Sequence, residues 1–406
     1  MALSSRDVFW KKHDGDNSAR TFEPIGKGFE NITFTDEKKR AIYKTEKEIS
    51  SGAGGDYLTA KKTDENGETT RCMVKVFHYM KLANNKMEDG DAMLARATRE
   101  KDLSQLIHRR RPKDNPCTGA MLCVEHLFQD KMHVILVFPT FAHVISLHTF
   151  IKNMLTAAWT ATAAFVEDYG ETQRYVVFNV IKLAAMLAKV LTRMNAFGIF
   201  HGDISPKNIL LSMRAEHYTG SLKVPRYFVK HMTKTLELPF SVDDVLEVRV
   251  INFQSSCLKG AESTSTSTST SSTARDVLAC DFSGHDYPKG GLYRDPFIDT
   301  AVADLKKTDA FRQFDSATQE GVLEGYWTRA EVYSFAKIFY VLFDPSALDT
   351  DFTKTKSLPN LNPKFTFLIS QWMNKENTAR SDFGRIGVHV GDAVKELQTQ
   401  WQERST

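Results

Sequence analysis

The side chains with the clearest chemical potential in this 406-residue chain lie in residues 201–211, HGDISPKNILL. Asp203 supplies a carboxylate that can accept the proton of a hydroxyl group, and Asn208, five positions later, supplies an amide oxygen that can bind a divalent cation. Phosphoryl transfer needs this combination, because the attacking hydroxyl must lose a proton while magnesium neutralises the phosphates. The segment follows a long apolar stretch and leads into a short one, which predicts a loop between a buried helix and a strand.

Two charged residues upstream can complete a phosphate site. Residues 72–78, CMVKVFH, have the pattern of a strand that carries Lys75. Residues 91–108 have the apolar spacing of a helix and carry Glu100, which can form an ion pair with that lysine. Taken alone, a strand lysine predicts only a solvated edge residue, so its interpretation depends on its neighbours in the chain.

A glycine cluster stands one hairpin before the lysine strand. Residues 51–57, SGAGGDY, can bring the backbone close to phosphate oxygens, because glycine carries no side chain. Tyr57 stands where the third glycine of a phosphate-binding G-x-G-x-x-G pattern is expected. By itself such a cluster predicts an ordinary turn, and only its position before Lys75 favours a phosphate-binding loop.

In this order, the glycine turn, the strand lysine, the helix glutamate and the H-x-D-x-x-x-x-N loop resemble the eukaryotic protein-kinase family. Residues 290–296, GGLYRDP, are similar to the segment that ends the kinase activation loop. Residues 330–343, AEVYSFAKIFYVLF, are similar to the hydrophobic helix that follows it. The resemblance extends over roughly residues 48–400.

The resemblance assigns roles to individual residues. It implies a catalytic base at Asp203 and a metal ligand at Asn208, and Lys207 as a partial substitute for the kinase lysine that Ser205 replaces. It also implies a hinge that begins with a Phe-Pro pair. The implied nucleotide-binding residues are Gly52, Gly54, Gly55, Lys75, Glu100 and Phe138.

The pattern fails at the position of the kinase metal-binding aspartate. Residues 246–257, LEVRVINFQSSC, resemble the strand and Asp-Phe-Gly triplet of kinases, but Asn252 replaces the aspartate and Gln254 the glycine. Asparagine offers only a neutral carbonyl to a hard cation that prefers carboxylates. Loss of the metal is expected to lower the rate on the order of thousands-fold. The resemblance therefore implies an inactive kinase in which Asn252 is a defective metal position.

A second stretch competes for the same role. Residues 277–284, VLACDFSG, also end an apolar run in Asp-Phe, and Asp281 as metal ligand would complete the site. We favour Asn252, because the Ser-Ser-Cys after it continues the resemblance and because Asp281 lies only fifteen residues before Pro296. An active Ser/Thr protein kinase with atypical metal binding stays open as the alternative.

Other departures support a degenerate site. Arg380 is similar to the kinase arginine that pairs with a glutamate after the activation-loop proline, but Phe297 follows Pro296 here, so we expect Arg380 to lack the usual partner. Gly202 replaces an arginine of the catalytic loop, and Glu331 replaces an aspartate of the large hydrophobic helix.

The composition restricts partners and compartment. The chain carries 53 basic and 50 acidic side chains, and this balance gives no electrostatic basis for nucleic-acid binding. The longest apolar run, residues 154–166, is too short to span a bilayer, so we expect no transmembrane segment. The cysteines lack C-x-x-C spacing and are expected to be buried thiols. They are Cys72, Cys117, Cys123, Cys257 and Cys280.

We expect an α+β fold of the bilobal protein-kinase type, with a small β-rich lobe and a larger, mainly helical lobe that carries insertions. The expected divisions are an N-terminal extension at 1–47, the small lobe at 48–138, the large lobe at 139–406, and loops or insertions at 213–245 and 258–285.

The expected function is that of a pseudokinase that acts as a protein-binding scaffold or allosteric regulator. Any ATP binding that is retained is expected to be weak or metal-free, and magnesium binding to be impaired. The expected partner is a protein, whose identity the sequence leaves open, rather than a nucleic acid. The insertions resemble those of the secreted rhoptry kinases and pseudokinases of apicomplexan parasites, which implies secretion toward a parasite vacuole or host cell. Without that resemblance we expect a cytoplasmic protein.

Overall fold

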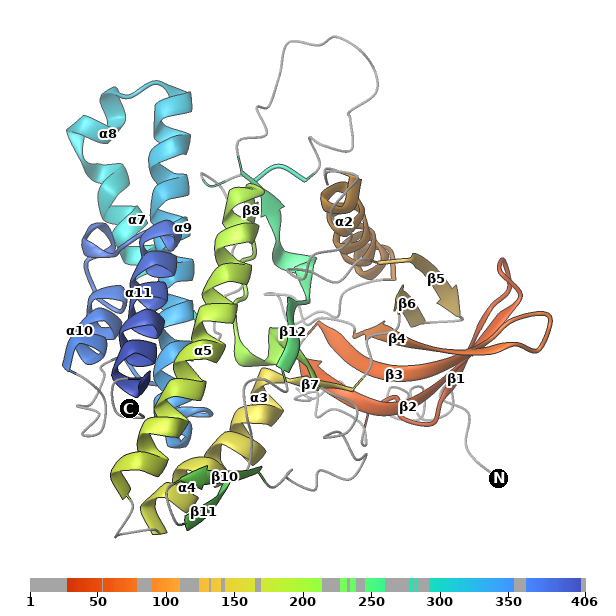
Figure 1. Cartoon of the computed structure of the whole chain (residues 1–406). Helices are drawn as coiled ribbons and strands as arrows, with labels where there is room; N and C mark the ends of the chain where they lie inside the picture. The colour runs from red at the N-terminus through yellow and green to blue at the C-terminus, as the bar shows by residue number, and fades with distance from the viewer. Residues whose placement is uncertain are drawn as a thin grey trace, which may run out of the picture.

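The computed structural model has mixed α and β structure, with strands from the first part of the chain on one side and helices from the later part on the other (Figure 1). This agrees with the α+β class predicted from the sequence. The structure describes residues 28–52, 54–78, 90–109, 124–130, 133–139, 143–164, 169–213, 227–231, 234–238, 245–259, 278–280, 282, 292–353 and 363–402.

The main sheet has six antiparallel strands in the order β1-β2-β3-β4-β6-β5. The sheet curls, because the Thr35 amide of its first strand donates a hydrogen bond to Asp130 of its last, at 2.8 Å. The strands are β1 (Thr33–Asp36), β2 (Ala41–Gly52), β3 (Gly55–Thr63), β4 (Thr69–Phe77), β5 (His126–Asp130) and β6 (His133–Phe138).

Alternation along the strands gives the sheet two apolar faces. Leu58 and Val74 belong to a cluster enclosed by the curled sheet. Tyr57 and Met73, one residue earlier on the same strands, belong to a second cluster with Met93 of helix α2 (Gly90–Arg109). Helix α2 therefore packs across the face that carries the odd-numbered residues of β3 and β4, and this face also carries Lys75.

The helical part has its own large apolar core, built around the long helices α5 and α9. Its helices are α3 (Leu147–Phe150), a π-helical turn (Ile151–Leu155), α4 (Thr156–Ala164), α5 (Tyr169–Ala196), α7 (Ile298–Lys307), α8 (Asp309–Gln313), α9 (Ser316–Phe343), α10 (Pro363–Trp372) and α11 (Phe383–Gln402). No helix among the described residues is long and apolar enough to cross a membrane.

Two short ladders bring a pair of loops together between the sheet and the helices. Strands β7 (Val144–Ser146), β9 (Ile209–Met213) and β12 (Val245–Val250) form a sheet in the order β12-β9-β7, and β8 (Ile199–Phe200) pairs with β13 (Cys257–Leu258). Ile209 lies opposite Val250 in one ladder, and Phe200 lies opposite Cys257 in the other. Residues 201–208 and 251–256 are thus held side by side at both ends.

The sheet begins earlier than the sequence predicts. Strand β1 and the first part of β2 lie before residue 48, where we expected an N-terminal extension to end. Within the region expected to be an insertion, at 213–245, strands β10 (Tyr227–His231) and β11 (Lys234–Leu238) form an antiparallel pair. Strand β12 starts at Val245, at the end of that region.

The expectation of unpaired, buried cysteines is wrong for two of the five. Cys257 and Cys280 form a disulfide across 23 positions of the chain, because a parallel bridge between Leu258 and Ala279 aligns the two segments. Cys72 is a buried free cysteine, as predicted. Cys117 and Cys123 lie outside the described residues.

Arg380 pairs with an acidic residue at a position that the sequence analysis did not consider. Asp295, the residue before Pro296, accepts hydrogen bonds from both terminal nitrogens of Arg380, at 2.5 and 3.2 Å. Both side chains are fully buried. The acidic partner thus lies on the other side of Pro296 from Phe297, the position to which the kinase resemblance assigns the glutamate.

Candidate functional site

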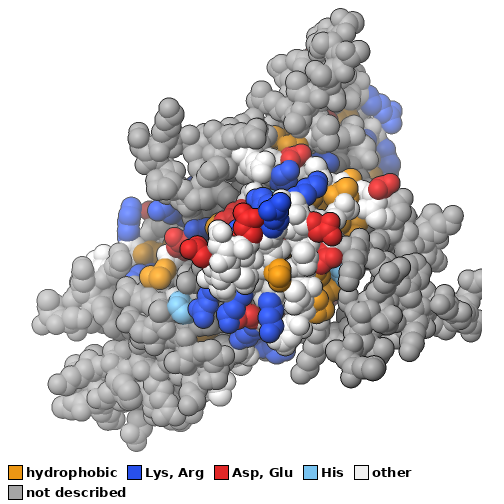
Figure 2. Space-filling view, turned by 90° about the vertical axis from the view of Figure 1, so that its right-hand side faces the viewer, with side chains coloured by type: hydrophobic (Ala, Val, Ile, Leu, Met, Phe, Trp, Pro, Cys, Tyr) orange, Lys and Arg blue, Asp and Glu red, His pale blue; other side chains and the backbone are white. Residues whose placement is uncertain are grey.

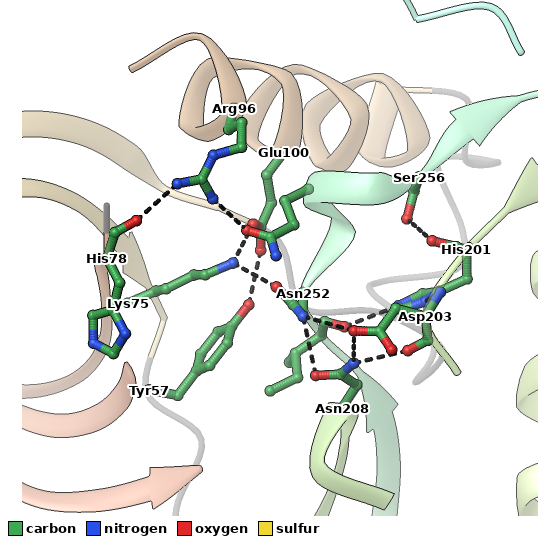
Figure 3. A network of polar contacts seen from close by, with 12 residues as sticks. Tyr57, Lys75, His78, Arg96, Glu100, His201, Asp203, Asn208, Asn252 and Ser256 are labelled. Carbon is green, nitrogen blue, oxygen red and sulfur yellow. Dashed lines mark hydrogen bonds and ion pairs between the residues drawn. The ribbon is translucent and has the colours of Figure 1, made fainter. Parts of the chain in front are cut away.

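Lys75 lies on an inner strand of the main sheet, between Tyr57 of β3 and Leu136 of β6. Its ammonium group is 2.5 Å from the carboxylate of Glu100 on α2, and both side chains are buried (Figure 3). Burial lowers the pKa of Lys75, and the adjacent Glu100 carboxylate opposes this effect. The pair predicted from the sequence is therefore present, and it fastens helix α2 to the sheet.

Asn252 follows strand β12 and makes a second contact with Lys75. Its φ of 72° lies in the left-handed region, which asparagine and aspartate tolerate better than most residues. The Asn252 side-chain oxygen accepts a hydrogen bond from the Lys75 ammonium at 2.8 Å.

The Asn252 amide also faces the loop at 201–208. Its nitrogen lies 3.2 Å from the side-chain oxygen of Asn208 and 3.4 Å from Asp203 Oδ2. Asn208 in turn donates from its side-chain nitrogen to the Asp203 backbone carbonyl at 2.7 Å and to Oδ2 at 2.8 Å. The structure thus brings Lys75, Asp203, Asn208 and Asn252 into one network, as Figure 3 shows.

The groups around the Asp203 carboxylate are mainly amides. The side-chain nitrogens of Asn208 and Asn252 face this carboxylate, at 2.8 and 3.4 Å. Among the described residues, no group of three or more His, Cys, Asp or Glu side chains could hold a metal. Asp281, the rival ligand, lies outside the described residues.

Buried polar groups fix the shape of the loop at 201–208. Glu331 of α9 accepts hydrogen bonds from the backbone nitrogens of His201 and Gly202, at 2.7 and 2.9 Å. His201 Nε2 lies 2.9 Å from the Ile251 carbonyl, and Ser256 Oγ donates to the His201 carbonyl at 2.8 Å. Glu331 therefore positions the loop backbone, and sequence reasoning had treated this residue only as a departure from a pattern.

Burial also shifts the pKa values of two residues in this loop, His201 and Asp203, and of Glu331, which holds the loop. It raises the pKa of Asp203 to about 6 and that of Glu331 to about 7, because a buried carboxylate loses its hydration. Burial lowers the pKa of His201 to about 4 for the same reason. Burial therefore favours the neutral form of His201 and the protonated form of Asp203.

The glycine turn joins β2 to β3, with Gly52 paired to Gly55 across the hairpin. A side chain at Gly54 would overlap the side-chain amide of Gln254, so that amide lies directly against the turn. The Gln254 amide oxygen also accepts a hydrogen bond from Arg96 of α2 at 2.8 Å. The sequence named Gln254 only as a lost glycine and did not identify Arg96, because a contact between residues so far apart leaves no local pattern.

Tyr57 and Phe138 lie close to Lys75 and to each other. Tyr57 is buried, its ring lies 5.8 Å from that of Phe138, and the Lys75 ammonium lies 5.1 Å from the Tyr57 ring centre. The Tyr57 hydroxyl donates to Glu100 at 2.8 Å. The predicted nucleotide-binding residues are therefore near one another, and Tyr57 fills the space between Lys75 and Phe138.

Lys207, predicted to assist catalysis, has an exposed side chain. Its backbone carbonyl accepts a hydrogen bond from Ser50 Oγ of β2 at 2.7 Å. The contact made by this residue therefore links the loop to the sheet through the main chain.

Comparisons with known proteins give no family for the chain. No protein-family model matches it, and no curated protein matches it.

Proposed function

We propose that the chain is a pseudokinase, with a bilobal protein-kinase-like fold that acts as a protein-binding scaffold or allosteric regulator without transferring phosphate. The order of the elements supports this: a glycine turn, a lysine strand, a helix with a paired glutamate, two strands, and then a mainly helical part. The loop at 201–208 and the Asn252 segment follow in the kinase order.

The observation that carries the proposal is the position of Asn252. Its amide connects Lys75 to Asp203 and Asn208 by hydrogen bonds, in the place where a kinase would use a metal ion and an aspartate. The three groups are thus held together without magnesium. A site organised in this way lacks the second carboxylate that would hold the divalent cation used in phosphoryl transfer.

Asn252→Asp tests the proposal through metal binding alone. In this variant the new carboxylate would lie between the Lys75 ammonium and Asp203, and the variant would thus gain the charged oxygen that a divalent cation prefers. Millimolar Mg²⁺ or Mn²⁺ should raise its melting temperature, since the metal binds only the folded state. The wild type should show no metal-dependent shift. A wild-type shift would contradict the proposal.

Asn374→Asp is the matched control. Asn374 lies in a turn outside the site, where its side-chain oxygen accepts a hydrogen bond from the Glu376 amide, and aspartate can accept the same bond. This substitution adds the same negative charge outside the site. Mg²⁺ or Mn²⁺ should therefore leave the melting temperature of Asn374→Asp unchanged if the effect is specific to position 252.

A phosphotransfer assay with Asp203→Asn tests the rival function. We expect the wild type and this variant to give the same background rate with ATP, magnesium and a mixture of protein substrates. Wild-type activity that Asp203→Asn abolishes would establish the active-kinase alternative, because Asp203 is the only base that this alternative invokes.

The surface and the disulfide support the remaining parts of the proposal. In the part of the face that Figure 2 colours, both Lys and Arg and Asp and Glu side chains are present, which favours a protein partner over a nucleic acid. The Cys257–Cys280 disulfide supports secretion into an oxidising compartment, because disulfides persist there and are rare in the cytosol.

A further inference from the structure

Gln254 lies where the phosphates of a bound nucleotide would meet the glycine turn. Its amide packs so closely against Gly54 that a side chain there would overlap it. Arg96 holds the same amide by a hydrogen bond of 2.8 Å and is itself anchored to the His78 carbonyl at 2.8 Å. The Gln254 side chain is therefore held between the turn and helix α2.

Tyr57 occupies the neighbouring space. Its side chain is 3% exposed, lies beside both Lys75 and Phe138, and is fixed by the hydroxyl contact with Glu100. A phosphate-binding loop with glycine at this position would leave that volume empty for a ligand. In this chain the Tyr57 ring lies beside the Lys75 ammonium and occupies that volume instead of a ligand.

A hydrogen bond also connects the sheet to the loop at 201–208. The hydroxyl of Ser50, two residues before Gly52, donates a hydrogen bond to the Lys207 carbonyl. Helix α2 has a further tie, because Arg99 Nε donates to the Ser256 carbonyl at 3.1 Å. These contacts connect the sheet and helix α2 to the loops at 201–208 and 251–256.

We infer that Gln254 and Tyr57 are internal occupants of the nucleotide site and that the wild-type chain excludes ATP and ADP with or without magnesium. This rests on the proposed function, which identifies the region as a nucleotide site. Helix α2 is then held in place by Arg96 and Arg99 instead of by a ligand. The folded form is consequently independent of nucleotide concentration.

Nucleotide binding by the full-length protein tests this inference. Affinity for ATP and ADP is measured by calorimetry and by thermal shift, in EDTA and in magnesium, for the wild type and for Gln254→Gly. Removing the amide clears the space beneath the glycine turn, so the dissociation constant for ATP in EDTA should fall by at least ~10-fold relative to the wild type. Tyr57→Gly combined with Gln254→Gly should lower it further.

Gln254→Leu is the control for side-chain bulk. Leucine fills a similar volume but cannot accept the Arg96 hydrogen bond, so it should exclude nucleotide as the wild type does. Nucleotide binding by Gln254→Leu as tight as by Gln254→Gly would overturn the inference that bulk at this position blocks the site. A folded double variant that still excludes nucleotide would overturn the roles given to both residues.

The wild type alone also decides the question if a variant fails to fold. Micromolar binding of ATP or ADP by the wild type overturns the inference. Binding without phosphate transfer would leave the proposed scaffold function in place, whereas transfer that depends on Asp203 would overturn that function as well. The two failures are therefore distinguishable.

Discussion

Glu331 shows at the residue scale how one buried carboxyl group can shape a loop and make its stability depend on pH. It accepts hydrogen bonds from the backbone nitrogens of His201 and Gly202, and Lys259 supplies an opposing charge that partly offsets the effect of burial. Its folded-state pKa of about 7 lies above the ordinary value of 4.5. The folded chain therefore keeps a proton that the unfolded chain has released.

Glu331→Gln should expose this titration. As pH rises from 4.5 to about 7, the wild-type free energy of unfolding should fall relative to that of the variant, because the unfolded state binds fewer protons. The relative change is expected to be on the order of 3 kcal/mol and to level off above that range. Urea unfolding of both proteins between about pH 4 and about pH 8 measures this difference in the free energy of unfolding. A constant difference would contradict the assignment.

At the element scale, the position of helix α2 depends on polar contacts made by neighbouring residues in the middle of the helix. Glu100 pairs with Lys75 of β4, and Arg96 and Arg99 contact residues 254 and 256. Burying an ion pair costs hydration, so its net contribution is small, but removal of one partner leaves an uncompensated charge. The pair therefore specifies where α2 sits more than it stabilises the fold.

Substitution of the pair tests this. Glu100→Leu should lower the free energy of unfolding by about 3–5 kcal/mol, because the Lys75 charge stays buried without its carboxylate. Lys75→Met combined with Glu100→Leu should lose much less, since neither charge remains. Urea unfolding of the two variants and of Lys75→Met completes the cycle. A double variant as unstable as the sum of the two single variants would argue against coupling between these residues.

At the scale of the whole molecule, distant segments are fastened by buried links across the helical part. The Cys257–Cys280 disulfide closes a loop beside β8, and the Arg380–Asp295 pair ties the segment before α7 to the segment before α11. Each link joins residues that are far apart in the chain. The disulfide fixes the segment after Asn252, and the ion pair fixes the segment before α7.

Removal of the disulfide should destabilise the protein without changing its fold. Cys257→Ser with Cys280→Ser is expected to lower the free energy of unfolding by about 2–5 kcal/mol, because the unfolded chain regains the freedom of the open loop. A reductant should lower the melting temperature of the wild type and leave that of the double variant unchanged. Equal sensitivity of both proteins to reductant would show that another disulfide accounts for the effect.

The sequence by itself determined the elements and the chemical groups of the site. The alternation in β4, the spacing of α2 and the loop at 201–208 are local patterns that predicted the elements, and the resemblance to kinases implied that Lys75, Glu100, Asp203 and Asn208 belong to one site. The replacement of an expected aspartate by Asn252 was also evident. A local pattern fixes which face a residue occupies, and a motif fixes which groups are available.

Only the tertiary structure decided how those groups pair. The Cys257–Cys280 disulfide, the Asp295 partner of Arg380 and the position of Gln254 against Gly54 depend on residues brought together by chain reversals. The energy of such contacts depends on distance and burial in the folded state, and neither is encoded in local residue spacing. The filling of the site by Gln254 and Tyr57 therefore followed from packing and could not be read from the motifs.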